Sequence, residues 1–255
     1  RPMVDAVAVA AEIKRFAPAG AALLLDSRKI RKGDVFFAVK GVHTDGRAFI
    51  EKACGAGASC VVAEKGDIGP CSVPVIEIDN LYRALGPIAA AYYGNSTAQM
   101  IGIAVTGTNG KTTTTMLSTA IIAEAGKSVV AAGNVGPNAL GELEKHRQVG
   151  TLPDFWVLEL SSFQLETTES LHCDSAALLN ITEDHIDWHG SMEKYAAAKR
   201  KIFSADTVRV LNREDPGSML SAEGVPSDLV HTFGSDAPKK IGDFGISDVG
   251  ALVWL

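Results

Sequence analysis

The sequence predicts an α/β protein: a small amino-terminal α/β domain, followed by a P-loop domain built on a doubly wound, mostly parallel sheet. Short apolar segments alternate with helical segments along most of the chain. Residues 100–105 form a continuous apolar run, which is typical of a parallel strand covered on both faces. A glycine-rich turn and a helix beginning at Lys111 follow that run directly, and this order is the strand–loop–helix arrangement of P-loop proteins.

The composition supports a folded protein and excludes several classes. The chain has 255 residues, enough for two domains, with 46% hydrophobic and 21% charged residues. Its net charge of -6 argues against general nucleic-acid binding, because a protein that tracks a phosphate backbone needs a basic face. No apolar run reaches the roughly 18 residues of a membrane span, and the first residues do not read as a signal peptide. We therefore expect a cytoplasmic, globular protein.

The cysteines carry no recognisable motif. No C-x-x-C pair occurs, and three of the four lie in a region of small residues that is typical of buried thiols. We expect reduced, structural cysteines at Cys54, Cys60, Cys71 and Cys173.

The predicted elements divide into two regions. A helix that begins after Asn80, as its N-cap, and ends near Gly94 marks the boundary, so that residues 1–96 form one domain and residues 97–255 the other. The first region is predicted to hold strands at 35–39, 60–63 and 75–78 and a helix at 47–57. The second is predicted to hold strands at 100–105, 128–132, 155–160, 175–179 and 208–211 and helices at 111–125 and 191–203.

The turn after residue 105 predicts a phosphate site that binds ATP. Gly107 and Gly110 let backbone N–H groups curl around a phosphate, and the helix N-terminus adds unpaired donors and partial positive charge. Lys111 can reach the β- and γ-phosphates, and the Thr112 hydroxyl can bind Mg²⁺. The spacing departs from the common motif, because Val105 stands where its first glycine would fall. The alternative is a chance glycine-rich turn.

Polar residues at other strand ends extend this site, each with a structural alternative. Glu159 closes an apolar strand and can bind Mg²⁺; the alternative is a capping role for Glu159 or Ser161. His185 follows another buried strand among acidic neighbours, which suits a second metal site or a structural histidine equally. Lys199 can belong to a solvated helix face, and Asn134 can be a simple turn residue.

Five motifs in order resemble the ATP-binding domain of the Mur ligases, the cytoplasmic enzymes that build the peptide stem of peptidoglycan. The resemblance covers residues 101–255, and its Ser-Ser-Phe-Gln-Leu-Glu segment is most similar to the branch that adds D-glutamate. The motifs are Gly-Thr-Asn-Gly-Lys-Thr-Thr at 107–113, Gly-Asn-Val-Gly at 133–136, Glu-Leu-Ser-Ser-Phe-Gln-Leu-Glu at 159–166, Asn-Ile-Thr-Glu-Asp-His at 180–185 and the run from Tyr195 to Lys199.

The resemblance implies a role for each matching residue. It implies two Mg²⁺ ions and a carbamylated Lys199, which turns a cation into a carboxylate-like ligand. The implied ATP-binding residues are Gly107, Thr108, Asn109, Gly110, Lys111, Thr112 and Thr113; the metal ligands are Thr112, Glu159, His185 and Lys199; the catalytic residues are Lys111, Asn134, His185 and Lys199; the substrate contacts are Asn134, Ser161 and Gln164.

The amino-terminal region resembles a different branch of the same family. Asp-Ser-Arg-Lys-Ile at 26–30 and Lys-Gly-Asp-Val-Phe-Phe-Ala at 32–38 look like the UDP-sugar domain of the third and fourth ligases of the pathway. The resemblance implies that Ser27 and Arg28 contact the UDP portion of the substrate; a turn with a solvated arginine is the alternative. The D-glutamate branch normally starts with a Rossmann-like nucleotide fold, and no G-x-G-x-x-G occurs near this terminus. The two halves therefore favour different substrates.

The predicted function is ATP-dependent addition of D-glutamate to UDP-N-acetylmuramoyl-L-alanine through an acyl phosphate. The alternatives are a diaminopimelate- or lysine-adding ligase and a non-catalytic fragment that binds the UDP-muramoyl precursor. An unrelated P-loop NTPase would typically carry a Walker-B Asp and a switch region, and we find neither. The family has a third, carboxy-terminal domain for the amino acid; we expect it to be absent here and this chain alone to be inactive. The oligomeric state stays open.

Overall fold

The computed structural model describes residues 4–41, 44–94, 100–246 and 252–254. Contacts between Cα atoms divide the chain into two compact units. Unit 1 comprises residues 1–98 and 143–151, and unit 2 comprises residues 99–142 and 152–255. The predicted boundary at residue 96 lies outside the described residues. The predicted α/β class with parallel sheets is confirmed in both units.

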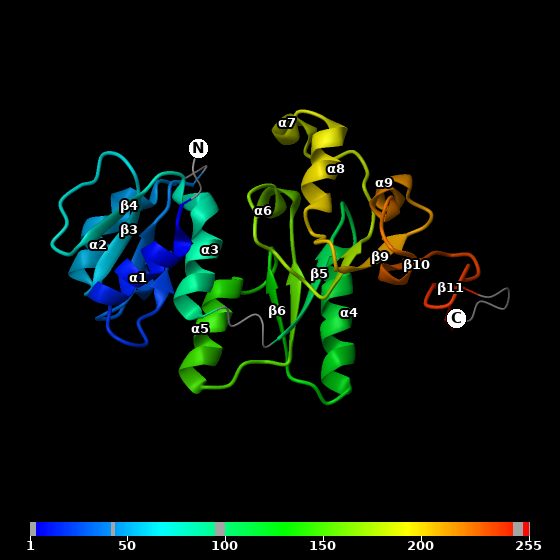
Figure 1. The fold of residues 1–255 in the computed structure, drawn as a ribbon, viewed down its shortest axis with the longest axis horizontal. Coiled ribbons are helices and arrows are strands. Elements are labelled where there is room, and N and C mark those ends of the chain that lie inside the picture. Colours follow the sequence, from blue (N-terminus) through cyan, green and yellow to red (C-terminus); the bar gives the residue numbers. More distant parts are fainter. Residues whose placement is uncertain (1–3, 42–43, 95–99, 247–251, 255) are drawn as a thin grey trace. The chain divides into compact units, whose positions relative to one another are not determined.

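Unit 1 is built on a four-stranded parallel sheet in the order β1-β2-β3-β4. Strands β3 and β4 of this sheet are labelled in Figure 1. Its strands are β1 (Leu23–Leu24), β2 (Val35–Ala38), β3 (Cys60–Glu64) and β4 (Val75–Ile78). Its helices are α1 (Ala6–Phe16), η1 (Ser27–Lys29), η2 (Gly46–Phe49), α2 (Ile50–Gly55) and α3 (Leu81–Tyr93), and most of α5 (Ala139–Val149) groups with them. The three predicted strands are present, and the predicted helix at 47–57 is split into η2 and α2.

Helices cover the sheet of unit 1, so its central strands are buried along their length. All four residues of β2 are buried, as are the first four of β3. Alternate residues of these strands, such as Phe36 and Val61, pack against Ile50 and Ala53 of α2. Helices α1 and α3 pack on each other, and their buried residues include Ile13 and Ile88. The strands read as apolar runs because both faces are covered.

The start of α3 differs from the prediction in its cap. Asn80 holds the N-cap position, but it is left-handed, with φ of 60°, and its side chain makes no capping hydrogen bond. The cap is supplied from the end of β3 instead. Both carboxylate oxygens of Glu64 accept hydrogen bonds, from the backbone N–H groups of Asn80 and Leu81, at 2.8 Å each. The carboxylate also lies at the positive end of the helix dipole.

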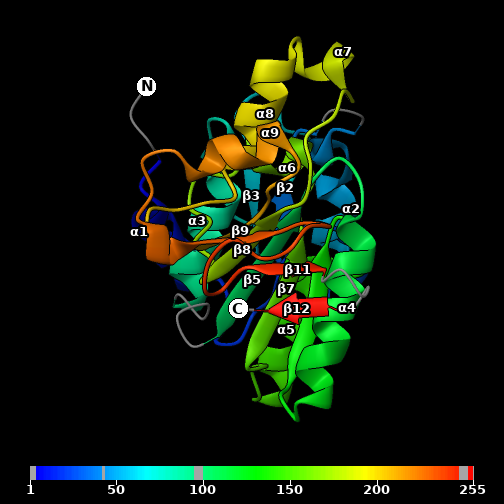
Figure 2. The ribbon, with the colours of Figure 1, turned by 90° about the vertical axis from the view of Figure 1, so that its right-hand side faces the viewer.

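Unit 2 contains an eight-stranded sheet in the order β12-β11-β10-β9-β8-β5-β7-β6, parallel except for the β11–β12 pair (Figure 2). Its strands are β5 (Ile101–Thr106), β6 (Val129–Gly133), β7 (Phe155–Glu159), β8 (Ser175–Leu178), β9 (Val208–Asn212), β10 (Val230–Phe233), β11 (Phe244–Ile246) and β12 (Leu252–Trp254). Its helices are α4 (Lys111–Glu124), α6 (Ser162–Glu166), α7 (Ile186–His189), α8 (Met192–Arg200) and α9 (Pro216–Met219), with the short turns η4 (Leu220–Ala222) and η5 (Ser227–Leu229).

Strand β5 lies where the chain changes direction across the sheet. The chain leaves β5 through α4 to β6 and returns to β7 on one side of β5, then crosses to β8 and β9 on the other side. Loops at the carboxyl ends of strands next to such a switch point form the usual ligand site of open α/β sheets. The five predicted strands of this unit are confirmed, whereas β10, β11 and β12 were not predicted.

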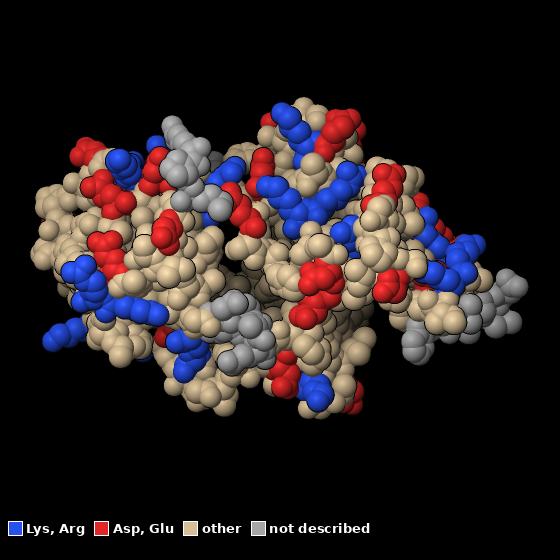
Figure 3. Space-filling model, viewed as in Figure 1, with Lys and Arg blue, Asp and Glu red and all other residues tan. Residues whose placement is uncertain are grey.

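Charge on the surface is mixed. On the face shown in Figure 3, acidic and basic side chains are interspersed over both units. No helix among the described residues is long and apolar enough to cross a membrane.

The cap of α3 gives a stability prediction. Replacing Glu64 with alanine removes both acceptors from the first turn, so we expect unit 1 to lose about 1–2 kcal/mol. The matched control is Asn80→Gly, which keeps the left-handed conformation without a capping side chain; its expected cost is a few tenths of a kcal/mol. Amide hydrogen exchange in α3 measures the loss of stability in both variants. Equal losses for the two variants would show that Glu64 is not the cap.

Candidate phosphate and ligation site

The phosphate loop joins the end of β5 to the start of α4, as predicted. Gly110 has φ of 83° and occupies the N-cap position of α4, where a side chain would be strained. A Cβ on Gly107 would lie 3.0 Å from the Cβ of Leu179 and 3.3 Å from the backbone nitrogen of Asn180. A larger residue at 107 would therefore have to push the end of β8 away by a few tenths of an ångström.

Asn180, directly after β8, fixes the loop's conformation. Its backbone carbonyl accepts a hydrogen bond from the N–H of Thr108 (3.0 Å). Its side chain accepts from the N–H of Asn109 (2.8 Å) and donates to the Asn109 carbonyl (3.2 Å). From the sequence, no separate role was predicted for Asn180. The available signal was its position: a polar residue at the end of a buried strand, next to the loop-bearing strand.

Helix α8 braces the same loop through a buried tyrosine. The hydroxyl of Tyr195, a residue with 1% of its surface exposed, lies 3.1 Å from Oγ1 of Thr108, and either oxygen can donate. Oγ1 of Thr108 also accepts from the N–H of Thr182 at 3.0 Å and lies 3.2 Å from the carbonyl oxygen of Thr182. Thr108 thus connects the loop, the segment after β8 and α8.

Two lysine ammonium groups meet at the carbonyl of Gly107. Nζ of Lys111 donates to the carbonyls of Gly107 (3.1 Å) and Thr108 (3.0 Å), and Nζ of Lys199 donates to Gly107 at 2.8 Å. Lys199 is 2% exposed and its Nζ lies 4.7 Å from the ring centroid of Tyr195. The alternative of a solvated helix face at Lys199 is therefore wrong, because α8 turns this lysine inward.

The environment of Lys199 favours its uncharged form. Burial is the main cause that lowers the pKa of Lys199, to about 8, and the neighbouring Lys111 adds to the effect. Asp184 has the opposite effect and raises the pKa of Lys199. A lysine with this pKa is partly uncharged near neutral pH, and an uncharged amine is a nucleophile.

Glu159 places a buried carboxylate at the end of β7, paired in register with Val105 of β5 and Gly133 of β6. It is 1% exposed, and its Oε1 accepts a hydrogen bond from Nδ2 of Asn134 at 3.2 Å. A Cβ on Gly133 would overlap the Glu159 carbonyl oxygen, so only glycine allows this close approach. A buried carboxylate beside a neutral amide fits a cation ligand, because burying an uncompensated charge is costly.

Ser161 and Gln164 have a structural role in helix α6. The Ser161 hydroxyl accepts from the N–H of Gln164 (3.3 Å), and Oε1 of Gln164 accepts from the N–H of Ser161 (2.9 Å). This reciprocal pair is a capping box. The capping alternative therefore holds for Ser161, and the cap is not Glu159.

His185 stands in a strained conformation at the start of α7. Its φ is 52°, which is unusual for a residue with a side chain and is typical of functional positions. The ring packs against Phe163 with 4.8 Å between ring centroids, and Nε2 lies 3.4 Å from a carboxylate oxygen of Asp184. Its side chain is 47% exposed.

His189 is a buried histidine that sequence reasoning missed. Nε2 lies 3.0 Å from the Ser162 hydroxyl, and the ring stacks on Phe163 at 5.6 Å between centroids. Burial lowers the pKa of His189, which outweighs the opposite effect of Glu166. A lone histidine in a short polar segment gives no signal of burial, so the sequence could not have identified it.

The predicted metal ligands lie in α4 (Thr112), at the end of β7 (Glu159), just before α7 (His185) and in α8 (Lys199). Thr112 is half-buried and Thr113 is exposed in the first turn of α4, which packs on β5, β6 and β7. Within the described ranges, no group of three or more His, Cys, Asp or Glu side chains is arranged to hold a metal ion. A metal site here would therefore need ligands in addition to Glu159 and His185. These would be the Thr112 hydroxyl, Lys199 and oxygens of the nucleotide.

Ser27 and Arg28 belong to unit 1. Ser27 is buried at the start of η1, whereas Arg28 is exposed and pairs with its neighbour Asp26, with 2.8 Å between Nη2 and Oδ2. The hydrogen bonds from Arg28 lower the pKa of Asp26 to about 2. This geometry is the turn with a solvated arginine that the sequence left open, and it leaves Arg28 accessible to a ligand.

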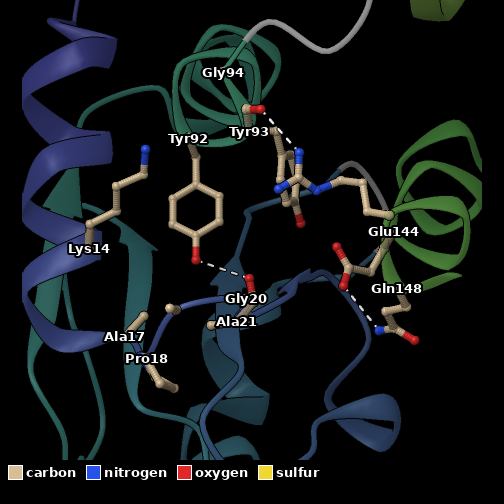
Figure 4. Close-up of a pocket in the computed structure, with 12 residues that line it drawn as sticks. Lys14, Ala17, Pro18, Gly20, Ala21, Tyr92, Tyr93, Gly94, Glu144 and Gln148 are labelled. Atoms are coloured by element: carbon tan, nitrogen blue, oxygen red, sulfur yellow. Dashed lines mark hydrogen bonds between the residues drawn. The ribbon is translucent and has the colours of Figure 1, made fainter. Parts of the chain in front are cut away.

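Unit 1 also contains a cavity of about 620 Å³ that no sequence motif predicted (Figure 4). The Tyr92 hydroxyl donates to the Ala21 carbonyl (2.9 Å), and Arg147 lies over the Tyr93 ring, 4.5 Å from its centroid. No predicted site residue lines this cavity. Its lining is Lys14, Ala17, Pro18, Ala19, Gly20, Ala21, Tyr92, Tyr93, Gly94, Glu144, Arg147 and Gln148.

Fold and loop together define an α/β protein with a P-loop at the switch point of a parallel sheet. Comparison with protein families then matches residues 105–249 to the Mur ligase middle domain and residues 21–93 to the Mur ligase family catalytic domain. The chain belongs to the Mur ligase family.

Several known proteins resemble the chain over different lengths. It is 55% identical over 153 residues to the UDP-N-acetylmuramoylalanine–D-glutamate ligase of Ralstonia nicotianae, covering 60% of this chain and 30% of that protein. It is 44% identical over 179 residues to the ligase of the same name from Bordetella avium, covering 70% and 34%. The chain thus spans about a third of the length of these relatives.

Solved structures match both units. A UDP-N-acetylmuramoyl-L-alanyl-D-glutamate–2,6-diaminopimelate ligase is 25% identical, with a TM-score of 0.66, over 93% of this chain and 54% of that one. The MurF ligase of Thermotoga maritima in complex with ADP has a TM-score of 0.65 at 23% identity, over 96% and 55%, and supports the fold alone.

The buried Lys199 predicts a pH dependence of stability. Its pKa is about 8 when folded against 10.5 for the ordinary side chain, so the folded chain binds fewer protons between these values. The stability that Lys199 contributes therefore rises from about pH 8 to about pH 10.5, by on the order of 3 kcal/mol.

Comparison with Lys199→Met isolates this effect from other groups. We expect the wild type to gain stability relative to the variant as the pH rises through this window. All three tryptophans lie in unit 2, so urea unfolding followed by their fluorescence reports on it. A stability difference that does not change with pH would contradict the assignment.

Proposed function

We propose that the chain is the ATP-binding part of an amide-forming ligase that adds D-glutamate to UDP-N-acetylmuramoyl-L-alanine. The observation that carries the proposal is the meeting of Lys111 and the buried Lys199 at the Gly107 carbonyl. A phosphate loop alone indicates a nucleotide site, whereas a second, inward-facing lysine with a pKa near 8 indicates further chemistry beside it. The 55% identity to a D-glutamate ligase over 153 residues supports the substrate.

ATP would bind at the start of α4. The backbone N–H groups of residues 107–113 and the N-terminus of α4 would hold the phosphates, and Lys111 would move its ammonium from the loop carbonyls to phosphate oxygens. Asn134, held by Glu159, would orient the reacting carboxylate and phosphate from the end of β6. These groups act by positioning and by neutralising charge, which dominate phosphoryl transfer.

Magnesium would be held by Thr112 and Glu159, with His185 and a modified Lys199 serving a second ion. The buried Glu159 carboxylate fits this role. When bound, the ions would supply positive charge for the oxygens of the phosphoryl group and the acyl phosphate.

Lys199 fits carbamylation. Its uncharged amine would attack carbon dioxide, forming an N–C bond and losing one proton, and the product would carry a negative charge in place of the positive one. The two positive groups that now share the Gly107 carbonyl would then become an oppositely charged pair.

A diaminopimelate- or lysine-adding ligase is the second candidate. Unit 1 favours it, because the Asp26–Ser27–Arg28 turn is the segment that resembles the UDP-sugar domain of those enzymes. A solved diaminopimelate ligase also matches both units. For either substrate we propose a cytoplasmic setting, with residues 1–96 binding the UDP portion and residues 97–255 binding ATP.

Phosphate release by the full-length protein tests the substrate. We expect release with ATP, UDP-N-acetylmuramoyl-L-alanine and D-glutamate. Release only with the UDP-muramoyl dipeptide and a diamino acid would transfer the assignment to the second candidate. No release with any combination would contradict both ligase assignments.

Lys111 tests the nucleotide site directly in this chain. Lys111→Ala removes a charged donor to the phosphates, so we expect ATP affinity to fall by about 10- to 100-fold. The control is Lys127→Ala, an exposed lysine beyond the other end of α4, which should leave affinity unchanged. Calorimetric titration measures the ATP affinity of both variants. Equal losses of affinity would show that ATP binds elsewhere.

A further inference from the structure

Two cysteine side chains of unit 1 lie side by side although 17 positions separate them in the sequence. The sulfur atoms of Cys54 and Cys71 are 2.9 Å apart. Cys54 lies near the end of α2, and Cys71 lies in the irregular segment between β3 and β4. Both are free thiols, and the sequence predicted only structural cysteines.

The two sulfur atoms are less than about 1 Å farther apart than in a disulfide bond. A disulfide has an S–S length of about 2.05 Å, so closing from 2.9 Å requires about 0.9 Å of movement. Cys71 lies in a loop, where a shift of this size involves no strand or helix. Its sulfur also lies 3.4 Å from the Val73 carbonyl oxygen, a contact that orients the thiol.

The pair is held in place and is also accessible. Cys54 and Cys71 both pack at the border of the apolar cluster that contains Ile50 and Ala53, so the fold and not chance collision keeps them together. Each thiol is partly exposed to solvent, whereas Cys60 and Cys173 are buried. A small reagent can therefore reach the first two thiols more easily than the others.

We propose that Cys54 and Cys71 are a redox-modification site, which closes to an intramolecular disulfide with a low-molecular-weight disulfide such as oxidised glutathione as the oxidant. The bond ties the end of α2 to the segment that leads into β4. Closure of this thiol pair does not depend on the ligase activity proposed above.

The reaction is a pair of thiol–disulfide exchanges. One cysteine thiolate attacks a sulfur of oxidised glutathione, breaks its S–S bond and expels a glutathione thiolate. The second cysteine thiolate then attacks the mixed disulfide, forms the Sγ–Sγ bond and expels the second glutathione. The cysteine pair loses two electrons and two protons, and the two glutathione molecules carry both away as thiols. Burial, with Cys54 adding to it, raises the pKa of Cys71 to about 11, so the thiolate is scarce at neutral pH and oxidation is slow.

The test equilibrates the 255-residue chain in mixtures of reduced and oxidised glutathione, then blocks free thiols under denaturing conditions. We expect mass spectrometry to show two blocked thiols of the four, with the chain two hydrogen atoms lighter and no glutathione attached. Trypsin leaves Cys54 and Cys60 in one peptide (residues 53–65) and Cys71 in the next (66–83), so fragmentation spectra must locate the linked sulfur. A link from Cys60 would overturn the proposal.

Variants and an unfolded control complete the experiment. Cys54→Ala should abolish the link, and Cys173→Ala should keep it. In the native chain the pair should close at a glutathione ratio about 100-fold more reducing than in urea, because folding pre-positions the sulfurs. Equal ratios in both states, or stable glutathione adducts on Cys54 or Cys71 in place of the link, would overturn the proposal.

Discussion

The Gly107 carbonyl is the point on which the candidate site depends, because two ammonium groups share it. Like charges this close to one acceptor repel each other, and burial adds to the cost. The structure accommodates the arrangement by leaving Lys199 with a pKa of about 8 and by bracing the loop from three sides: Asn180 after β8, Thr182 and Tyr195 of α8. A nucleotide phosphate or a modified lysine would each supply the negative charge that this cluster lacks.

The topology explains why these residues meet. Strand β5 stands between β7 and β8, so the loop that follows it lies between two other strand ends. Strand β7 supplies Glu159, whose partner Asn134 follows β6, and β8 leads into Asn180 and the segment to His185. Glycine is required at 133, where a Cβ would overlap the Glu159 carbonyl, and at 107 it lets the loop lie close to the end of β8. The order of the strands in the sheet, and not proximity in the sequence, therefore decides which residues share the site.

The parts of this protein that could be predicted from sequence are those with strong local signals. Apolar runs located β2, β3, β5 and β7, and the glycine-lysine-threonine segment located the loop. Strands β10 (Val-His-Thr-Phe) and β11 (Phe-Gly-Ile) contain no continuous apolar run, and β12 is only three residues long, so they gave no such signal. The capping box of Ser161 and Gln164 was readable from its spacing, whereas the Glu64 cap depends on a contact between β3 and α3 that local sequence does not encode. The burial of Lys199 was likewise invisible, because a Lys-Arg-Lys run fits a solvated helix face equally well.

Helix α5 has a consequence for how the chain can be divided. Its first four residues group with unit 2 and the rest with unit 1, so the polypeptide passes between the units three times. Arg147 of this helix donates to the carbonyl of Tyr93 at 3.1 Å, which fastens the end of α3. A gene fragment ending near residue 96 would therefore lose part of unit 1, and any exchange of modules between relatives would have to carry residues 143–151 along with the amino-terminal segment.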